Sequence, residues 1–322
     1  MLRIVFMGSD AIARPALDWL AGEGSQVAQV AAVFTQPDRA TGRGQKVQPN
    51  AIKLWAQTRN VPVFQPEKID GTERQQLAEL KPDLTLVMAY GHILKQDVID
   101  TPRLGTLNLH TSILPKYRGA SPIQTATASG DRETGVTLMR IVPALDAGPV
   151  ADVERVAIGA LDTAAEVEAK LAAACAPLLA RALPRIAAGT QDFTEQDAAR
   201  ATFCRKLAKA DGVLDFSQPA AALAARINGL MPWPGCTVAI NGEPVKLGLA
   251  DVGSLLDDKP AGPGVVVGAD AEGLLVGTGR GILRLRKLQR AGGRMLPAPE
   301  FLRGWAVAAG TRLPSQPMPP LV

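Results

Sequence analysis

Histidine and cysteine are both scarce in this chain, which has two histidines and three cysteines among its 322 residues. The cysteines, Cys175, Cys204 and Cys236, are odd in number and lie in no CxxC pair or Cys/His cluster. A disulfide framework, a structural zinc site and other metal centres are therefore not expected. This cysteine usage fits a reducing compartment, so we predict a cytoplasmic protein.

Long apolar runs are also missing. No uninterrupted run reaches the roughly 18 apolar residues that a membrane helix needs. The segment MLRIVFMGSD passes directly into a strand pattern and lacks the features of a signal peptide. We therefore expect no membrane association. A composition of 47% hydrophobic and 20% charged residues is typical of a soluble globular protein, and the length suits two domains.

The phosphate-binding loops of common nucleotide folds are absent as well. After the first predicted strand the chain reads GSDAIARP, which lacks the GxGxxG spacing of dinucleotide-binding proteins. A Walker A loop is absent too. These absences disfavour a dehydrogenase and predict that the chain uses no NAD.

The first half of the chain alternates short apolar runs with helical patterns. Strands are predicted over residues 3–8, 27–34, 83–91 and 104–110, with helical spacing between them. The strands show little polar alternation, as expected for a sheet that is covered on both faces. This order predicts an α/β fold with a doubly wound, mostly parallel sheet, whose ligand site lies at the carboxyl ends of the strands.

Two further strands and a long helix follow. The strands are predicted over 134–142 and 149–158. An Ala-rich helix begins at Thr163, where TAAE predicts a capping box with Glu166, and should run to about Gly189. Pro184 is expected to kink this helix or to end it early.

A change in the residue pattern indicates a second domain. A polar stretch from residue 189 is typical of an interdomain linker. Beyond it, one helical stretch is followed by short strands between NG, AGPG, AEG and GRG turns, as in a small antiparallel barrel. We predict a catalytic domain over 1–188, a linker over 189–205, a smaller OB-like β-barrel domain over 206–313 and a flexible, proline-rich tail over 314–322.

The basic charge is unevenly distributed. Residues 206–322 hold 13 Lys/Arg and 9 Asp/Glu, so they account for the whole net charge of +4. Within them, GTGRGILRLRKLQRAGGR carries six basic residues and no acidic one: Arg280, Arg284, Arg286, Lys287, Arg290 and Arg294. Two interpretations stay open, a solvated strand face and a contact with a polyanion such as a phosphate backbone.

The segment LNLHTSILPKYRGASP contains one of the two histidines. Asn108 and His110 are two positions apart, so on a strand their side chains point to the same face, next to a loop at the ligand edge of the sheet. A lone histidine is more often structural than catalytic, and Asp146, beside Gly148 and Pro149, could be only a turn former. If Asn108, His110 and Asp146 converge, they suit acyl transfer to an amine. Asn108 would hold an oxyanion, His110 would move a proton and Asp146 would orient the imidazole.

These residues resemble a known family. NLHTSILPKYRGASPIQ, followed by ETGVT and LDAGP, is similar to the signature of the folate-dependent formyltransferases. FTQPDRATGRGQKVQP (34–49) and MPWPGC (231–236) narrow the resemblance to members that act on initiator tRNA, and it extends over essentially the whole chain. The resemblance implies transfer of a formyl group from 10-formyltetrahydrofolate to the α-amino group of methionyl initiator tRNA, by direct attack of the amine.

The resemblance also assigns residues. It implies that Asn108, His110 and Asp146 are the catalytic trio, and that a basic residue beyond the linker, Lys206, lies near the tRNA. The implied folate-binding residues are Ser112, Ile113, Leu114 and Pro115, with Tyr90 and Gly91 in the loop on the pterin side. The implied tRNA-binding residues of the inserted 34–49 loop are Arg39, Arg43 and Lys46. We expect a monomer.

Two alternatives remain at this point. One is a formyltransferase that acts on a small amine, such as an amino-sugar nucleotide. The other, of a different class, is a non-catalytic folate- or RNA-binding protein on the same scaffold. The basic inserted loop and the positive second domain favour a large polyanionic substrate over a small amine. Formyl transfer by wild type, compared with His110→Ala, would separate an enzyme from a binding protein.

Overall fold

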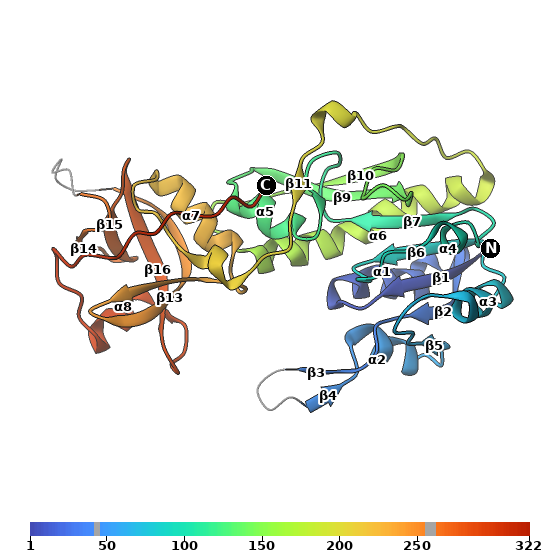
Figure 1. Ribbon diagram of the computed structural model, residues 1–322, viewed down its shortest axis with the longest axis horizontal. Coiled ribbons are helices and arrows are strands. Elements are labelled where there is room, and N and C mark those ends of the chain that lie inside the picture. The colour runs from blue at the N-terminus through green and yellow to red at the C-terminus, as the bar shows by residue number, and fades with distance from the viewer. Residues whose placement is uncertain (42–45, 255–261) are drawn as a thin grey trace. The chain divides into compact units, whose positions relative to one another are not determined.

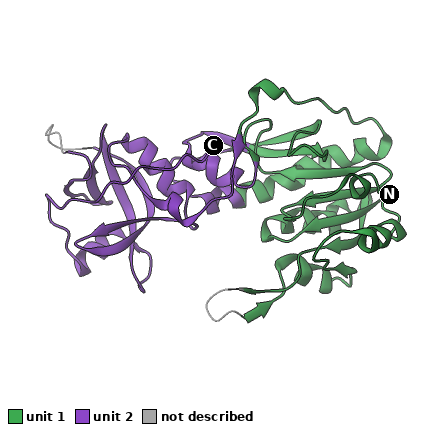
Figure 2. Cartoon of the chain, in the orientation of Figure 1, with its two compact units in different colours: residues 1–118, 135–156, 169–202 green, residues 119–134, 157–168, 203–322 purple. Residues whose placement is uncertain are grey.

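The computed structural model describes residues 1–41, 46–254 and 262–322 (Figure 1). The chain divides into two compact units, each built from separate stretches (Figure 2). Unit 1 comprises residues 1–118, 135–156 and 169–202, and unit 2 comprises residues 119–134, 157–168 and 203–322.

A seven-stranded sheet of order β10-β9-β7-β6-β1-β2-β5 forms the centre of unit 1. Its strands are β1 Leu2–Gly8, β2 Ala28–Phe34, β5 Val63–Phe64, β6 Leu84–Met88, β7 Thr106–His110, β9 Glu133–Arg140 and β10 Val150–Ala157. The pairs β1–β2, β1–β6, β2–β5 and β6–β7 are parallel, which confirms the mostly parallel sheet. The chain crosses to the other side of β1 between β5 and β6. A doubly wound sheet binds ligands beside such a reversal, at the carboxyl ends of the strands.

Both faces of this sheet are covered. Val87 and Met88 are neighbours in β6, so their side chains point to opposite faces. Val87 belongs to a core cluster with Leu77 of helix α3 (Gly71–Glu79), whereas Met88 contacts Cys175 of helix α6 (Ala164–Ala188). The near-continuous apolar runs of the strands follow from this double coverage.

The other helices among the described residues are short. They are α1 Arg14–Ala21, α2 Ala51–Gln57, α4 Gln96–Ile99, α5 Pro122–Ala128, α7 Ala220–Gly229 and α8 Ala298–Gly304. Short 3-10 helices cover Ala11–Ala13, Glu23–Gln26, Ala198–Arg200 and Lys209–Gly212.

Helix α6 begins where the capping box predicted it. The Glu166 carboxylate accepts hydrogen bonds from the backbone N–H and the hydroxyl of Thr163. Of the two outcomes expected at Pro184, an early end does not occur, because α6 continues past it to Ala188. A kink stays a prediction. By length and composition α6 could cross a membrane, but a buried core helix passes the same test. Val167, Leu171 and Leu178 are all fully buried.

Strand β9 is the exception to the parallel order. It pairs antiparallel with β7, with Leu107 opposite Arg140 and His110 opposite Thr137. The carboxyl end of β9 therefore lies beside the start of β7, away from His110. The loop over residues 141–149 has to double back to bring Asp146 toward the end of β7.

Unit 2 contains an antiparallel sheet of order β12-β13-β16-β15-β14, with β17 on β16. Its strands are β12 Cys236–Ile240, β13 Glu243–Gly253, β14 Val266–Ala269, β15 Leu274–Gly277, β16 Ile282–Arg290 and β17 Leu296–Pro297. This confirms a separate antiparallel-sheet domain. Helix α7 lies against β13, and α5 packs so closely on α7 that a Cβ at Gly229 would collide with the backbone of Ala128. Helix α5, from the first half of the chain, was not predicted to join this unit.

The C-terminal tail is bound along unit 2, in contrast to the flexible tail that its prolines suggested. The backbone N–H of Gln316 donates to the Leu214 carbonyl, and the Ser315 hydroxyl accepts from the N–H of Phe216. Arg205 and Arg226 donate to the carbonyls of Pro320 and Pro319. Leu321 is buried in the core of the unit. Proline prevents regular structure but leaves its carbonyl free to accept, so an irregular segment can still be held by donors from its neighbours.

The expected linker is also part of a compact unit over most of its length. Residues 189–202 belong to unit 1, and Thr194 forms an isolated antiparallel bridge with Val150 of β10. The two backbone hydrogen bonds of this bridge are 2.8 and 2.9 Å long. Only the last part of the predicted linker, from Phe203, belongs to unit 2.

Candidate active site

The carboxyl ends of β1, β2 and β6 are joined by a small polar network. The Ser9 hydroxyl, just after β1, donates to the Tyr90 carbonyl and accepts from the backbone N–H of Gln36 at 3.0 Å. The Gln36 side chain donates to the same Tyr90 carbonyl at 3.2 Å. These bonds fix the turn after β6, where Ala89 has a φ of 48° and Gly91 a φ of 81°. One wall of the ligand edge is thereby held in place.

Strand β7 carries the two central polar side chains. Asn108 and His110 occupy alternate positions, so they lie on one face of the sheet, and His110 is the last residue of the strand. His110 is 6% exposed. Asn108 is half-buried, and no described residue hydrogen bonds to its amide. Its donor is therefore available to a bound oxygen atom.

The two ring nitrogens of His110 have different surroundings. Nε2 lies 2.9 Å from the carbonyl oxygen of Tyr117. A carbonyl only accepts, so Nε2 carries a hydrogen and donates it. Nδ1 lies 3.7 Å from Oδ2 of Asp146, a distance for charge attraction and not for a hydrogen bond. Nδ1 is thus the nitrogen without a hydrogen bond to a described residue, and the Asp146 carboxylate is close enough to attract a positive charge on the ring.

The loop over 141–149 brings Asp146 to the histidine through an unusual backbone. Asp146 has a φ of 47°, in the left-handed region that costs a residue other than glycine about 1 kcal/mol or more. Gly148 closes the loop against β9, because a Cβ at this position would collide with the Arg140 carbonyl. The Asp146 side chain is 15% exposed. Sequence alone could not distinguish this arrangement from an ordinary turn.

The segment after β7 is a compact turn. The Ser112 hydroxyl is fully buried and donates to the Lys116 carbonyl at 2.6 Å. Thr137 of β9 donates to the Ser112 carbonyl at 2.6 Å and accepts from the N–H of Leu114 at 3.2 Å. Ser112 therefore builds the turn with its side chain, whereas Ile113 and Pro115 are half-buried and can contact a ligand. Leu114 is buried.

Tyr90 and Gly91 lie on the other side of the strand end. The Tyr90 ring is 2% exposed and packs in the core cluster that contains Leu77 and Val98. Its hydroxyl has no hydrogen-bond partner among the described residues, and burial raises its pKa well above the usual value. Only the Tyr90 carbonyl and the exposed Gly91 backbone are placed to form a wall for a ligand.

The expected tRNA contacts are solvent-exposed where they are described. Arg39 lies in β3 (Arg39–Thr41) and Lys46 in β4 (Lys46–Gln48), which pair as an antiparallel hairpin. Both residues are exposed, and Arg39 contacts Glu67 at 3.3 Å. Lys206, in unit 2, is exposed too. Arg43 lies outside the described residues.

Several basic side chains of the stretch 280–294 are paired with acidic side chains in the fold. Arg284 and Arg286 of β16 form ion pairs with acidic residues of the neighbouring strands and turn: Asp251, Asp270 and Glu272. Arg290 pairs with Glu243 at 2.8 Å. Cross-strand pairing in an antiparallel sheet brings these acids from distant parts of the sequence. Arg280, Lys287 and Arg294 are exposed.

Three residues at the site escaped the sequence analysis. Gln196 donates to the carbonyls of Asp146 and Gly148, and Arg118 donates twice to the Gln196 side-chain oxygen. The Thr202 hydroxyl accepts from the N–H of Tyr117, whose φ is 60°. Gln196 and Thr202 lie in the stretch that composition identified as a linker. The only signal was Arg118, in the YRGA motif.

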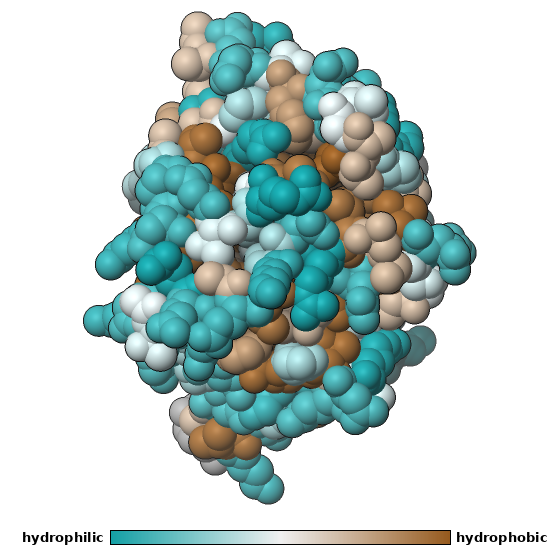
Figure 3. Space-filling view, turned by 90° about the vertical axis from the view of Figure 1, so that its right-hand side faces the viewer, coloured by the Kyte–Doolittle hydropathy of each residue, from teal (hydrophilic) through white to brown (hydrophobic). Residues whose placement is uncertain are grey.

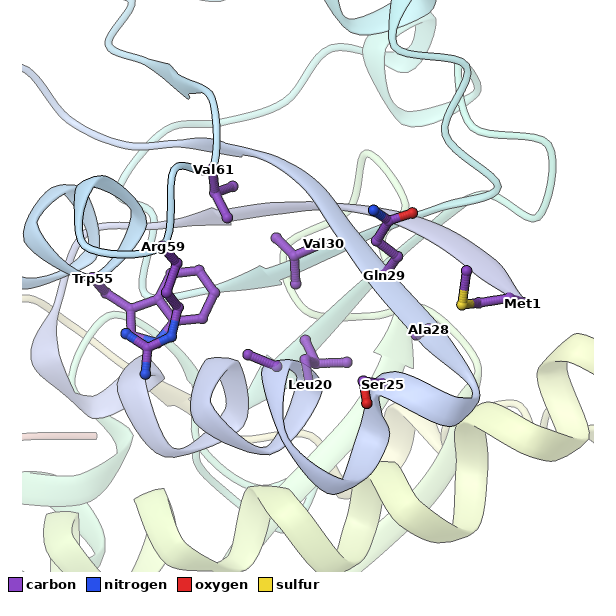
Figure 4. A pocket seen from close by; sticks show the side chains of 10 residues that line it. Met1, Leu20, Ser25, Ala28, Gln29, Val30, Trp55, Arg59 and Val61 are labelled. Atoms are coloured by element: carbon purple, nitrogen blue, oxygen red, sulfur yellow. The ribbon is translucent and has the colours of Figure 1, made fainter.

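A separate open cavity of about 500 Å³ lies between β2, α1 and α2. Figure 4 shows Leu20, Val30 and Val61 around it, with Arg59 over the Trp55 ring. None of the predicted site residues lines this cavity.

On the side of unit 1 drawn in Figure 3, apolar side chains lie in several patches between polar ones. Across the described part of the chain, no group of three His, Cys, Asp or Glu side chains could hold a metal ion.

Comparisons with known proteins agree with this architecture. The formyl transferase family matches residues 2–183, and the formyl transferase C-terminal domain matches residues 206–306. Methionyl-tRNA formyltransferase of Chromobacterium violaceum is 41% identical over 314 residues, with 97% of this chain and 99% of that protein covered. The enzyme of the same name from Methylococcus capsulatus is 41% identical over 313 residues, with 97% and 99% covered.

A solved structure shares the fold at low identity. An N-formyltransferase from Helicobacter canadensis, in complex with folinic acid and dTDP-3-aminofucose, superposes with a TM-score of 0.65 at 18% identity. The match covers 88% of this chain and 99% of that one. At this identity the likeness shows the fold alone. The full-length similarity to the curated enzymes goes further: the chain belongs to the formyl transferase family, in its methionyl-tRNA formyltransferase branch.

Proposed function

We propose that this chain transfers a formyl group from 10-formyltetrahydrofolate to the α-amino group of methionyl initiator tRNA, with Asn108, His110 and Asp146 as its catalytic residues. One observation carries the proposal. His110, at the carboxyl end of β7, has Nδ1 3.7 Å from Asp146, while the Asn108 amide beside it is left without a described partner. A histidine beside a carboxylate, next to an amide donor that has no described partner, suits acyl transfer to an amine.

The bound 10-formyltetrahydrofolate supplies the formyl carbon on its N10 nitrogen. The amine nitrogen of the aminoacyl group forms a bond to this carbon, and the bond from the carbon to N10 breaks. The Asn108 amide donates to the carbonyl oxygen as it becomes negative. Such a donor is worth about 3–4 kcal/mol in related acyl transfers.

The proton balance of the step falls on His110. The attacking amine loses one proton, and the departing N10 gains one. Because Nε2 donates to the Tyr117 carbonyl, the proton passes through Nδ1. Asp146 lies near this nitrogen and stabilises the ring while it carries the extra charge. No serine or cysteine nucleophile is needed, since the substrate amine attacks directly.

The residues around the strand end fit a flat, partly polar ligand. The loop from Ile113 to Pro115 presents two half-buried apolar side chains on one side. The backbone of Gly91 lies on the other, held by Ser9 and Gln36 through the Tyr90 carbonyl. We assign the donor to this edge of the sheet, and the acceptor stem of the tRNA to the exposed residues Arg39 and Lys46, with Arg43. Lys206 of unit 2 is assigned a separate contact with the tRNA.

The test is a formylation assay with 10-formyltetrahydrofolate and three acceptors: methionyl initiator tRNA, methionyl elongator tRNA and an amino-sugar nucleotide. We expect the initiator tRNA to react fastest, with kcat/KM that falls steeply as salt increases. A salt-insensitive reaction with the amino-sugar nucleotide as the better substrate would overturn the acceptor assignment. If no acceptor were formylated, the chain would be a binding protein and not an enzyme.

A further inference from the structure

The two groups that orient the His110 ring come from separate loops. Tyr117, in the turn after β7, supplies the carbonyl at Nε2, and Asp146, in the β9–β10 loop, supplies the carboxylate near Nδ1. Both residues have positive φ, 60° for Tyr117 and 47° for Asp146. Left-handed backbone at a residue other than glycine persists only where surrounding contacts hold it.

The side chain of Gln196 lies between these loops. Its Nε2 donates to the carbonyls of Asp146 and Gly148, both at 2.8 Å. Its Oε1 accepts from Nε and Nη2 of Arg118, at 3.1 and 2.7 Å. An amide has two donor hydrogens and two acceptor lone pairs, so the capacity of Gln196 is fully used. The amide orientation is unambiguous, because carbonyls only accept and a guanidinium only donates.

Arg118 carries this link to the other loop. It follows Tyr117 directly, is 7% exposed, and its backbone N–H donates to the Thr202 carbonyl at 2.8 Å. Thr202 in turn accepts from the Tyr117 N–H through its hydroxyl and donates its own N–H to the Pro115 carbonyl. The stretch 194–202 is therefore attached to β10 at Thr194, to the Asp146 loop at Gln196 and to the Tyr117 turn at Thr202.

We propose that Gln196, supported by Arg118, is a positioning residue for the transfer reaction. It fixes the distance between the Asp146 loop and the Tyr117 turn, and so holds the His110 ring with Nδ1 toward the substrate. The inference rests on the proposed function. It assigns a role in catalysis to a segment whose polar composition is typical of a linker.

Three variants separate positioning from packing. Gln196→Ala removes all four hydrogen bonds. Gln196→Glu keeps an acceptor for the buried Arg118, as a charge-assisted pair, but cannot donate to the Asp146 and Gly148 carbonyls. The control is Gln191→Ala, because Gln191 also donates from Nε2 to two backbone carbonyls, those of Ala151 and Asp192, which belong neither to the Asp146 loop nor to the Tyr117 turn.

The kinetic readout is kcat and KM for both substrates, at temperatures where each variant is folded. We expect kcat to fall about 10- to 100-fold in both Gln196 variants, with each KM within about threefold of wild type, because a displaced catalytic group affects the transition state. Gln191→Ala should match wild type. If Gln196 only accepted the hydrogen bonds of Arg118, Gln196→Glu would behave as wild type, which would overturn the proposal.

The second readout is independent of activity. The chain has two histidines, so ¹⁵N spectra of histidine-labelled protein contain two rings, and a His92→Asn variant assigns them. We expect one tautomer for His110 in wild type and in Gln191→Ala, with hydrogen on Nε2, and tautomer averaging in both Gln196 variants. An unchanged His110 spectrum with reduced kcat would also contradict the proposal. Wild-type protein that formylates nothing would instead refute the proposed function, while the spectra would still test the positioning.

Discussion

The two units bury polar side chains in different ways. In unit 1, His110 donates from Nε2 to the Tyr117 carbonyl and has Nδ1 near Asp146, while Asn108 next to it keeps an amide without a described partner. In unit 2, the guanidinium groups of Arg284 and Arg286 form an arginine cluster with Asp251, Asp270 and Glu272. The first arrangement leaves one donor for a ligand, whereas the second uses its charges on its own strands.

The difference shows why charge counted along a sequence is a poor guide to charge available for binding. Six basic residues without an acid in the segment suggested a polyanion contact, but three of them pair with acids from neighbouring strands. A single histidine in an apolar run looked less conspicuous, yet it lies at the carboxyl end of a parallel strand. We therefore expect the histidine centre, formed by Asn108, His110 and Asp146, to serve chemistry and the arginine cluster to serve stability.

The largest effect is expected at the histidine centre. In His110→Ala, formyl transfer should fall about 10²- to 10⁴-fold, because the proton acceptor near Asp146 is lost. Stability should change by only about 1–2 kcal/mol, the cost of leaving the Tyr117 carbonyl without its donor. Formylation rates and urea unfolding of the same preparations measure both quantities. A variant with near-wild-type kcat would remove His110 from the mechanism.

The opposite pattern is expected at the arginine cluster. Arg286→Met removes contacts to Asp251 and Glu272 and should destabilise unit 2 by about 2 kcal/mol. The cost is below that of a fully buried pair because the Arg286 side chain is 20% exposed. Below the unfolding transition, kcat/KM for the tRNA should stay within about twofold of wild type.

The matched variant for this prediction is Arg280→Met. Arg280 is exposed, and its side chain has no ion pair with a described residue. The substitution should change stability by less than about 0.5 kcal/mol. If Arg286→Met lost tRNA-dependent activity while still folded, the arginine cluster would be a binding surface after all, and the comparison between the units would fail.

Much of the fold was predictable because it depends on local pattern. Apolar runs predict the mostly parallel sheet and its strands around 3–8, 27–34 and 104–110. Residues a few positions apart predict the cap at Thr163. The reversed direction of β9 was not predictable, since its sequence, ETGVTLMR, is compatible with either strand direction. Direction is set by tertiary pairing, which the pattern of one strand does not encode.

Only the part of the site that lies on a single strand could be predicted from the sequence. Periodicity placed Asn108 and His110 on one face, and the roles of both stay predictions. Gln196 and Thr202 could not be found, because their polar stretch reads as a linker until the bonds to Asp146, Arg118 and Tyr117 are seen. The tail was misjudged for the same reason: Pro319 and Pro320 signal irregular structure, whereas the arginines that bind them are about a hundred positions away.

Asp211 is expected to make a smaller, pH-dependent contribution to the stability of unit 2. Its carboxylate is 1% exposed and accepts from Arg205 and from the Ala208 N–H. The hydrogen bond from Arg205 lowers the pKa of Asp211 below its usual value of 3.8. A lowered folded pKa contributes stability that is present above the unfolded value and is lost as pH falls through the folded one.

The measurement compares wild type with Asp211→Asn. At neutral pH the variant should be less stable by about 1–2 kcal/mol, discounted because Arg205 is 43% exposed. The difference should shrink as pH falls below about 4, where the wild-type carboxylate becomes protonated. Urea unfolding at several pH values tests this. A difference that grew toward low pH would have the wrong sign and would contradict the assignment.

The smallest effect is expected at the exposed hairpin. The side chains of Arg39 and Glu67 are 63% and 75% exposed, so their contact should contribute less than about 0.5 kcal/mol. In contrast to Arg286, Arg39 can exchange this weak contact for a phosphate. In Arg39→Ala, we expect kcat/KM for the tRNA to fall a few-fold at low salt, and the slope of log kcat/KM against log salt to lose about one unit. Arg103→Ala is the control, because Arg103 is 68% exposed and paired with Asp83, but is not part of the hairpin. Equal slopes in the two variants would mean that Arg39 only solvates the hairpin, and that exposure alone does not make a basic residue a contact for RNA.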